Sequence, residues 1–102
     1  MISRQLCDTT ELMTSEDYRD RFVAEYWQTK IRYEKLRTFN RRIEAATRTA
    51  YAEVCARVES PEHTCPDILL IDQEDAMRKY LDILEVRAII EGIDLKNHGL
   101  KP

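Results

Sequence analysis

Glycine and proline are scarce in this sequence, and their positions exclude most β-rich folds. Of the 102 residues, two are glycine and three are proline, and all five of them follow residue 60. Sandwiches, barrels and Rossmann-type units need many more turn residues than this, so the scarcity argues against each of them. Charged residues make up 34% of the chain. This composition favours a soluble, all-helical domain.

Long hydrophobic runs are also missing. The longest apolar run, Ile68-Leu69-Leu70-Ile71, is far shorter than the stretch of about 20 residues that spans a bilayer. The first residues, Met1-Ile2-Ser3-Arg4, do not lead into the apolar segment of a signal peptide. We therefore expect a cytoplasmic protein.

Cysteine and histidine are few and scattered. The three cysteines are an odd number at irregular spacing, and the chain has no Cys-x-x-Cys pair, so neither a disulfide framework nor a pre-formed half of a zinc site is indicated. A zinc site made by His63, Cys65 and Cys55, with Cys7 or His98 as the fourth ligand, is the alternative. The sequence favours Cys55 as a small buried side chain and Cys65 as a loop thiol. We expect no metal and no cofactor.

Motifs of catalysis are absent as well. The chain has no glycine-rich phosphate loop and no Gly-x-Ser-x-Gly sequence. Its two histidines, His63 and His98, fall in the expected linker and tail. Paired carboxylates such as Asp72 and Asp75 arise by chance at an acidic helix start, and without a cleft they do not indicate acid–base chemistry. We predict that the protein is not an enzyme.

The chain does contain a long helical seam. From residue 22 onward, side chains that can pack recur at alternating steps of four and three residues, and a mean spacing of 3.5 keeps one stripe against a partner helix. The seam consists of Phe22, Tyr26, Thr29, Tyr33, Leu36, Asn40, Ile43, Thr47, Ala50 and Val54. Because one small core gives modest stability, such a helix is expected to share surface with further copies of the chain.

The expected order of elements is a lead-in segment, a long helix, a linker, a second helix and a tail. The boundaries are residues 1–13 for the lead-in segment, about 15–58 for the first helix, 59–66 for the linker, about 67–91 for the second helix and 94–102 for the tail. The predicted fold is therefore all-α, a long antiparallel helical hairpin that is coiled-coil-like and oligomeric.

Local signals set these boundaries. A hydroxyl followed three residues later by a carboxylate, at Thr14 to Asp17, predicts an N-terminal cap. Pro61 and Pro66 end the first helix, and Gly92 predicts a left-handed C-cap after the second. Continuity through Asn40 stays open, since asparagine is a weak helix former. We expect the tail to be extended.

The second helix is apolar around more of its circumference than one neighbour can cover. One side carries Leu70, Met77, Tyr80, Leu81, Leu84 and Ala88, and the stripe is widened by Ile83, Val86, Ile89 and Ile90. This helix is expected to touch two neighbours.

Basic residues gather in the middle of the first helix. Residues 30–48 carry seven basic and two acidic side chains, although the net charge of the chain is −3. Guanidinium groups hold phosphates and aromatic faces stack on bases, so this basic segment suits a nucleotide. The candidate ligands of phosphate are Arg37, Arg41 and Arg42, and the candidate stacking residues are Trp27 and Tyr33. The alternative is that the arginines form salt bridges and a solvated face.

Several packing positions carry a resemblance to a known family. They are Tyr18-x-x-Arg21-x-x-x-Glu25-Tyr26, Lys35-Leu36-x-x-Phe39, and Leu69-Leu70-x-x-Gln73-x-x-x-Met77-x-x-Tyr80-x-x-x-Leu84-x-x-Arg87. Together with the segment from Leu84 to Ile93, they resemble a family of small helical-hairpin proteins encoded by tailed phages. The hairpin is similar to that of the phage anti-CBASS and anti-Thoeris sponges, multimeric proteins that sequester cyclic nucleotide or cyclic ADP-ribose signals of bacterial immunity.

The chain departs from that pattern in one place. Family members turn soon after the position of Phe39, whereas here the segment from Asn40 to Cys65 intervenes. No binding residue is therefore transferred from the family.

Resemblance and charge together predict a non-enzymatic phage anti-defence protein of the host cytoplasm. It is expected to bind and sequester a cyclic nucleotide or cyclic ADP-ribose-type signal in pockets of a homo-oligomer. The alternative is a structural or adaptor protein that binds a host or phage protein through its wide apolar stripe. Neither a membrane nor duplex nucleic acid is an expected partner, since the chain is acidic overall and lacks a helix-turn-helix.

Overall fold

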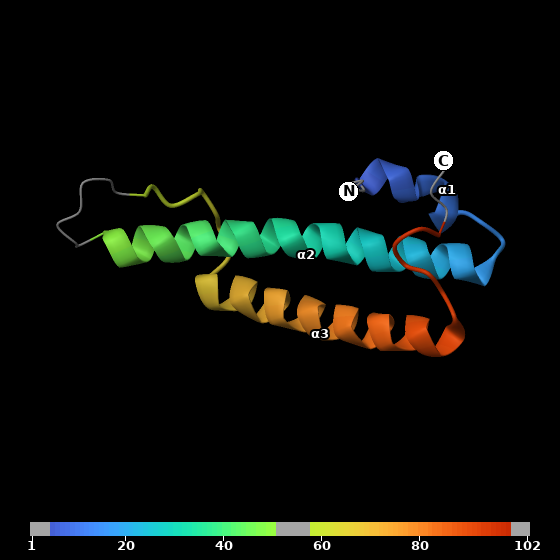
Figure 1. Cartoon of the computed structure of the whole chain (residues 1–102). Helices are drawn as coiled ribbons and strands as arrows, with labels where there is room; N and C mark the ends of the chain where they lie inside the picture. Colours follow the sequence, from blue (N-terminus) through green and yellow to red (C-terminus); the bar gives the residue numbers. More distant parts are fainter. Residues whose placement is uncertain (1–4, 51–57, 99–102) are drawn as a thin grey trace.

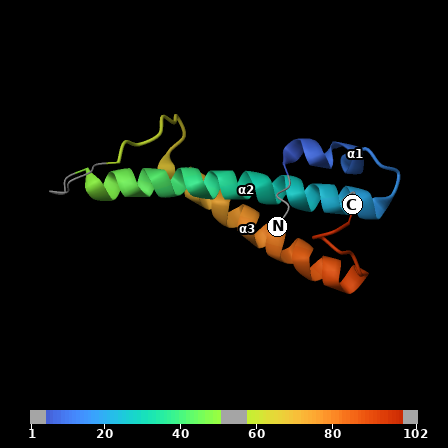
Figure 2. The same ribbon diagram turned by 45° about the horizontal axis from the view of Figure 1, so that its top comes forward.

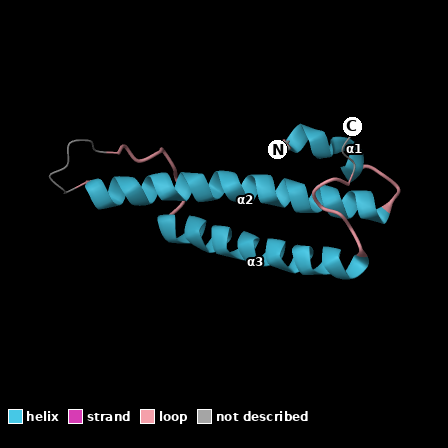
Figure 3. Cartoon of the chain, in the orientation of Figure 1, coloured by secondary structure: helices cyan, strands magenta, loops and turns pink. Residues whose placement is uncertain are grey.

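The fold is an antiparallel pair of helices with a short helical segment packed on one end. The computed structural model describes residues 5–50 and 58–98. Its elements are the 3₁₀ helix η1 (Leu6–Thr9) and the α-helices α1 (Thr10–Met13), α2 (Tyr18–Thr49) and α3 (Asp67–Glu91). α2 and α3 lie side by side in opposite directions (Figure 1), and the described ranges contain no strand (Figure 3). The prediction of an all-α antiparallel hairpin is confirmed.

α2 begins slightly later than the sequence suggested. Its N-cap is Asp17, whose carboxylate accepts a hydrogen bond from the backbone N–H of Arg19 at 2.9 Å. The hydroxyl of Ser15 lies ahead of the helix, where it accepts from the backbone N–H of Asp17 and donates to the carboxylate of Asp20 at 2.7 Å. The helix therefore begins at Tyr18 rather than near residue 15, because the carboxylate of Asp17 rather than an earlier hydroxyl satisfies the free N–H of Arg19.

α2 is continuous through Asn40 and extends to Thr49. At 1.5 Å per residue, its 32 residues span about 48 Å. The expected continuation of this helix over residues 51–57 lies outside the described residues, and Val58 is no longer helical. α3 is shorter, with 25 residues, so the last turns of α2 reach past its first turn.

One apolar core joins α2, α3 and the segment after α3. Its buried members are Phe22, Val23, Tyr26, Leu81, Leu84, Ala88 and Ile93. The first part of the predicted seam therefore faces α3, and burial continues at Thr29, Asn40 and Ile43. Thr47 and Ala50, further along the seam, are exposed, because α3 begins near Asn40 and does not extend alongside them.

The lead-in segment packs on the side of α2 opposite α3 (Figure 2). The side-chain amide of Gln28 donates to the hydroxyl of Thr9 at 3.0 Å and contacts the sulfur of Met13 at 3.1 Å. Leu12 packs against the apolar core. Residues 5–13 thus form two short helical turns that cover the first half of α2.

The segment after α3 folds back onto α2, which corrects the expectation of an extended tail. Gly92 takes the predicted left-handed conformation with φ 69°, and Ile93, 8% exposed, turns into the core. The indole N–H of Trp27 donates to the carbonyl of Leu95 at 2.6 Å. Further on, the Nε2 of His98 lies 2.5 Å from the carboxylate of Asp20. The burial of Ile93 and the two polar contacts, made by Trp27 and Asp20, stabilise this segment up to residue 98 against the conformational entropy of a free chain end.

α3 leaves much of its apolar surface uncovered. Its exposed aliphatic side chains are Ile68, Leu69, Ile71, Ile83, Val86, Ile89 and Ile90. The prediction that this stripe is too wide for one neighbour is confirmed within the described residues. None of the helices in these ranges is both long enough and apolar enough to cross a membrane.

Candidate functional site

A groove of about 550 Å³ lies where α2 passes the first turn of α3. It exists because α3 starts beside Asn40 while α2 continues for more than two further turns. Its lining residues are Asn40, Arg41, Ile43, Glu44, Thr47, Arg48, Asp67, Ile71 and Glu74. The groove therefore combines guanidinium groups, carboxylates and an aliphatic wall, and a ligand with both anionic and hydrogen-bond-donating groups would suit it.

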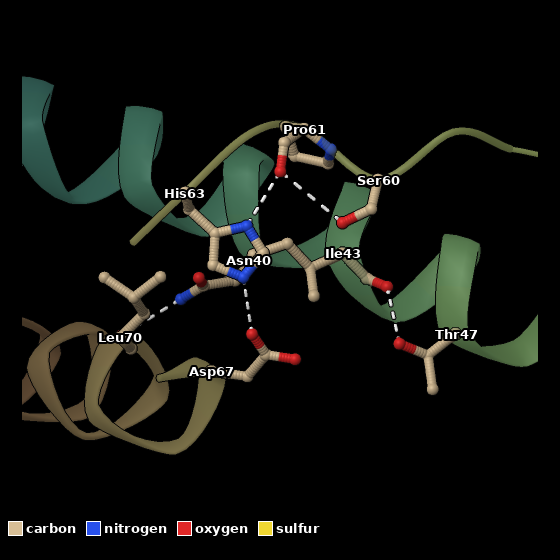
Figure 4. Close-up of polar contacts among 8 residues, drawn as sticks. All are labelled: Asn40, Ile43, Thr47, Ser60, Pro61, His63, Asp67 and Leu70. Atoms are coloured by element: carbon tan, nitrogen blue, oxygen red, sulfur yellow. Dashed lines mark hydrogen bonds and ion pairs between the residues drawn. The ribbon is translucent and has the colours of Figure 1, made fainter. Parts of the chain in front are cut away.

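Asn40 joins the two helices at the inner end of the groove. Its side-chain N–H groups donate to the carbonyl of Leu70 at 3.1 Å and to the carboxylate of Glu74 at 3.0 Å (Figure 4 shows the contact with Leu70). The residue is 9% exposed, and its side-chain oxygen is buried with no hydrogen-bond partner among the described residues. An orphan acceptor of this kind is uncommon in a folded protein.

The linker is fastened to this end of the hairpin by His63 (Figure 4). Its Nδ1 donates to the carbonyl of Pro61 at 2.7 Å, and its Nε2 lies 2.6 Å from the carboxylate of Asp67. The imidazole also stands edge-on to the ring of Phe39, with the ring centres 5.8 Å apart. The carbonyl of Pro61 and then the carboxylate of Asp67 raise the pKa of His63 above its ordinary value of 6.5.

We expect the anchoring of the linker to weaken with rising pH. Because the folded-state pKa of His63 is raised, the stabilising contact is fully present below pH 6.5 and is lost as the pH rises through the folded-state pKa. A titration of the His63 ring resonances by NMR should give a pKa above 6.5, and Asp67→Asn should lower it. A pKa at or below 6.5 in the unmodified protein would contradict the contact.

The basic side chains in the middle of α2 are mostly unpaired. Steps of four and seven residues place Arg37, Arg41 and Arg48 on one face of the helix. Of these three, Arg48 forms an ion pair with Glu44 at 2.9 Å. Within the described ranges, no hydrogen bond or ion pair involves the side chains of Arg32, Lys35, Arg37, Arg41 or Arg42. In the same ranges, α3 forms ion pairs inside itself and, through Asp67, with His63 of the linker, but none with an arginine of α2. The salt-bridged form of the alternative is therefore not seen there, whereas a solvated arginine face agrees with the exposure of Arg37, Arg41 and Arg42.

The structure does not bring all five predicted ligand-binding residues together. Arg41 lines the groove, whereas Arg37 and Arg42 are exposed on α2 nearby. Trp27 and Tyr33 pack against the core instead. Trp27 lies 14 residues before Arg41, about 21 Å along the helix axis, so one protomer cannot place both on one small ligand.

Some functional features of this end were not visible in the sequence. Asn40 stood out as a weak helix former on the seam, and its role as a cross-helix donor depends on where α3 begins. Glu74 gave no signal beyond the acidic start of α3. His63, considered as a zinc ligand, is engaged with the linker and α3.

No metal centre is visible in the part of the chain that the structure describes, since no three His, Cys, Asp or Glu side chains there are close enough together to hold an ion. Cys7 and Cys65 are exposed free thiols. Cys55, expected to be a small buried side chain, lies outside the described residues.

Comparison with protein-family models matches the Sequestin model over residues 16–90, from just before α2 to the last turn of α3. The chain belongs to the Sequestin family. No curated protein and no solved structure matched it. The region matched to Sequestin contains all of α2, all of α3 except its last residue, and all the groove residues. Membership fits a protein that sequesters a ligand and has a binding role rather than a catalytic one.

Proposed function

We propose that this chain is a phage anti-defence protein that sequesters a nucleotide-type immune signal, a cyclic nucleotide or a cyclic ADP-ribose derivative. The binding pockets lie in a homo-oligomer. Membership of the Sequestin family supports the sequestering role. The observation that carries the choice of ligand is the set of arginines on α2 that have no partner among the described residues.

Unpaired arginines favour a phosphate-bearing ligand for an electrostatic reason. Arg37 and Arg41 are one helical turn apart on the same face, so both guanidinium groups can reach one ligand. Each can donate two parallel hydrogen bonds to a phosphate without first breaking an ion pair within the described chain. Arg42 projects from a different face and would contact a ligand held against another protomer.

The groove supplies the other half of the recognition. Asp67 and Glu74 are carboxylate acceptors in the groove that the cationic Arg41 lines. A base or ribose offers N–H or O–H donors next to a phosphate, which matches this mixed lining. Trp27 and Tyr33 would act as stacking residues only if a second copy brought them near the ligand.

Calorimetric titration against cyclic dinucleotides, cyclic trinucleotides and cyclic ADP-ribose isomers tests the proposal. We expect at least one member to bind the unmodified protein at tens of micromolar, and Arg37→Ala with Arg41→Ala to weaken that binding by about tenfold or more. Arg19→Ala is the matched control, because Arg19 is an exposed arginine at the far end of α2. The absence of heat with every member would remove the proposal.

A role in binding another protein is the second candidate, favoured by the exposed aliphatic side chains of α3. The ratio of absorbance at 260 and 280 nm of the purified protein separates the two. A nucleotide that co-purifies through gel filtration supports sequestration. A nucleotide-free protein that captures a host protein supports the adaptor role.

A further inference from the structure

The segment that follows α3 is a folded turn that lies on α2 (Figure 1). Residues 94–98 are called the strap below. The carboxylate of Asp94 accepts hydrogen bonds from the backbone N–H groups of Lys96 and Asn97 at 3.0 and 3.2 Å, and the side-chain amide of Asn97 donates to it at 3.2 Å. The backbone N–H of His98 donates to the carbonyl of Asp94 at 3.0 Å. These hydrogen bonds make the strap a defined turn rather than a loose chain end.

The strap is held against α2 near both of its ends. The indole N–H of Trp27 donates to the carbonyl of Leu95 at 2.6 Å, and the Nε2 of His98 lies 2.5 Å from the carboxylate of Asp20. Leu95 also packs against the apolar core. Because the hydrogen bonds inside the strap do not involve α2, the turn keeps them when it moves away. A mostly exposed segment of this kind opens locally, without global unfolding.

Ile93 provides a fixed pivot for such a motion. Its side chain is buried in the core, and its backbone N–H donates to the carbonyl of Ala88 at 2.9 Å. The left-handed Gly92 directly before it ends α3. The chain is therefore fixed up to Ile93, and the strap begins at the next residue.

We propose that the strap is a lid on Trp27, which is closed in the free chain and opens to present the indole to a planar ring such as a nucleobase. The inference deepens the proposed function and rests on it for the choice of a nucleobase. In the closed form Trp27 is half-buried, and its N–H is engaged by Leu95. Whichever copy holds the phosphates of a ligand, Trp27 is available to its base only after the strap has moved.

The other surroundings of Trp27 suit a nucleotide. The ring of Tyr26 stands edge-on to the indole with the ring centres 5.5 Å apart, and the ammonium of Lys30 lies 5.6 Å from the centre of the indole ring. An aromatic ring next to a cation can stack on a base and attract its phosphate. Tyr26 and Lys30 belong to α2 itself, whereas the strap does not, so its displacement opens space without disrupting that helix.

Asp20 links the lid to the start of the chain. One of its carboxylate oxygens accepts a hydrogen bond from the hydroxyl of Ser15 at 2.7 Å, and the other faces His98. The hydrogen bonds from Ser15 and then from His98 lower the pKa of Asp20 below its ordinary value of 3.8, so its carboxylate stays charged at neutral pH. Ser15 and the strap both lie outside residues 16–90, which match the Sequestin model. The lid is therefore built from segments that flank the matched hairpin.

Acrylamide quenching of tryptophan fluorescence tests the lid, because Trp27 is the only tryptophan of the chain. His98→Ala removes the contact with Asp20, and we expect it to raise the quenching constant about twofold or more while circular dichroism keeps its helical signal. His63→Ala is the matched control and should leave quenching unchanged, because this other histidine contacts an aspartate of the linker end of the hairpin. Equal quenching of His98→Ala and the unmodified protein would overturn the proposal.

A cross-link that holds the strap shut gives the converse test. In a chain with Cys7, Cys55 and Cys65 replaced by serine, Asp20→Cys and His98→Cys are joined by a short bis-maleimide. Adenosine monophosphate is the probe, since a base stacked on Trp27 quenches its fluorescence. Because apparent affinity follows the fraction of open form, we expect the cross-link to weaken binding of the probe about fivefold or more relative to the same chain before cross-linking. Quenching by the probe that is absent, or that the cross-link does not change, would overturn the proposal.

The lid and the proposed function can fail separately. If both quenching experiments give the expected results but no member of the cyclic nucleotide panel binds, sequestration fails and the lid stands. If a panel member binds with an affinity that the cross-link does not change, the lid is wrong and sequestration stands.

Discussion

Leu84→Ala should remove about 2–5 kcal/mol from the free energy of unfolding. Leu84 is 2% exposed and lies in the cluster that joins α2, α3 and Ile93. Truncation leaves a cavity that the rigid helical pair can only partly close. Because domains of this size have about 5–15 kcal/mol of stability in total, the loss should lower the midpoint of urea unfolding, followed by circular dichroism, by a large fraction.

The matched control for this substitution is Ile89→Ala on the same helix. Ile89 is 81% exposed, so its truncation should change the unfolding free energy by no more than about 0.5 kcal/mol. Equal losses for the two variants would mean that the packing of α3 on α2 is not the one described above.

Asn40→Asp is the second substitution with a large expected effect. The new carboxylate would replace two N–H donors and face the carbonyl of Leu70 and the carboxylate of Glu74 in a site that is 9% exposed. An uncompensated buried charge of this kind costs about 3–5 kcal/mol. Urea unfolding at pH 7 should show a loss of this size.

The pH dependence of this variant has a defined sign. Burial and the neighbouring Glu74 raise the folded-state pKa of the introduced carboxyl, so folding favours its protonated form. The variant should therefore approach the stability of the unmodified protein as the pH falls toward 4 and lose stability as the pH rises.

Asn40→Leu is the control for Asn40→Asp. It removes the orphan acceptor together with both donors and introduces no charge, but it leaves the partly buried carboxylate of Glu74 without its donor, so its cost should be about 1–3 kcal/mol, below that of Asn40→Asp. If Asn40→Asp proved as stable as Asn40→Leu at pH 7, the bridge from Asn40 to α3 would be wrong.

The hairpin itself could be predicted from the sequence because its signals are local. The seam from Phe22 to Ile43 has the period of a packed helix, and a left-handed Gly92 is expected where a helix ends. The position of the segment after Gly92 could not be predicted. It depends on contacts of Leu95 and His98 with Trp27 and Asp20, which lie 68 and 78 residues earlier in the chain.

The candidate site was predictable in composition only. A cluster of basic residues around Arg41 is visible in the sequence, and the structure places Arg41 in a groove. Which arginines lack a partner depends on the course of α3, whose carboxylates pair within α3, with His63 or with Asn40 instead. The sequence predicts Trp27 as a stacking residue. Its packing could not be predicted, because it involves a hydrogen bond to Leu95 that no local sequence pattern indicates.

The unequal lengths of α2 and α3 divide the hairpin into two ends of different local stability. At one end, residues 22–29 are enclosed by α3, α1 and the segment after α3. At the other, no helix of the described residues lies beside the backbone around Thr47 and Ala50, and both side chains are exposed. Amide protons there should exchange with deuterated solvent by local fraying, orders of magnitude faster than those near Val23, whose exchange requires global unfolding.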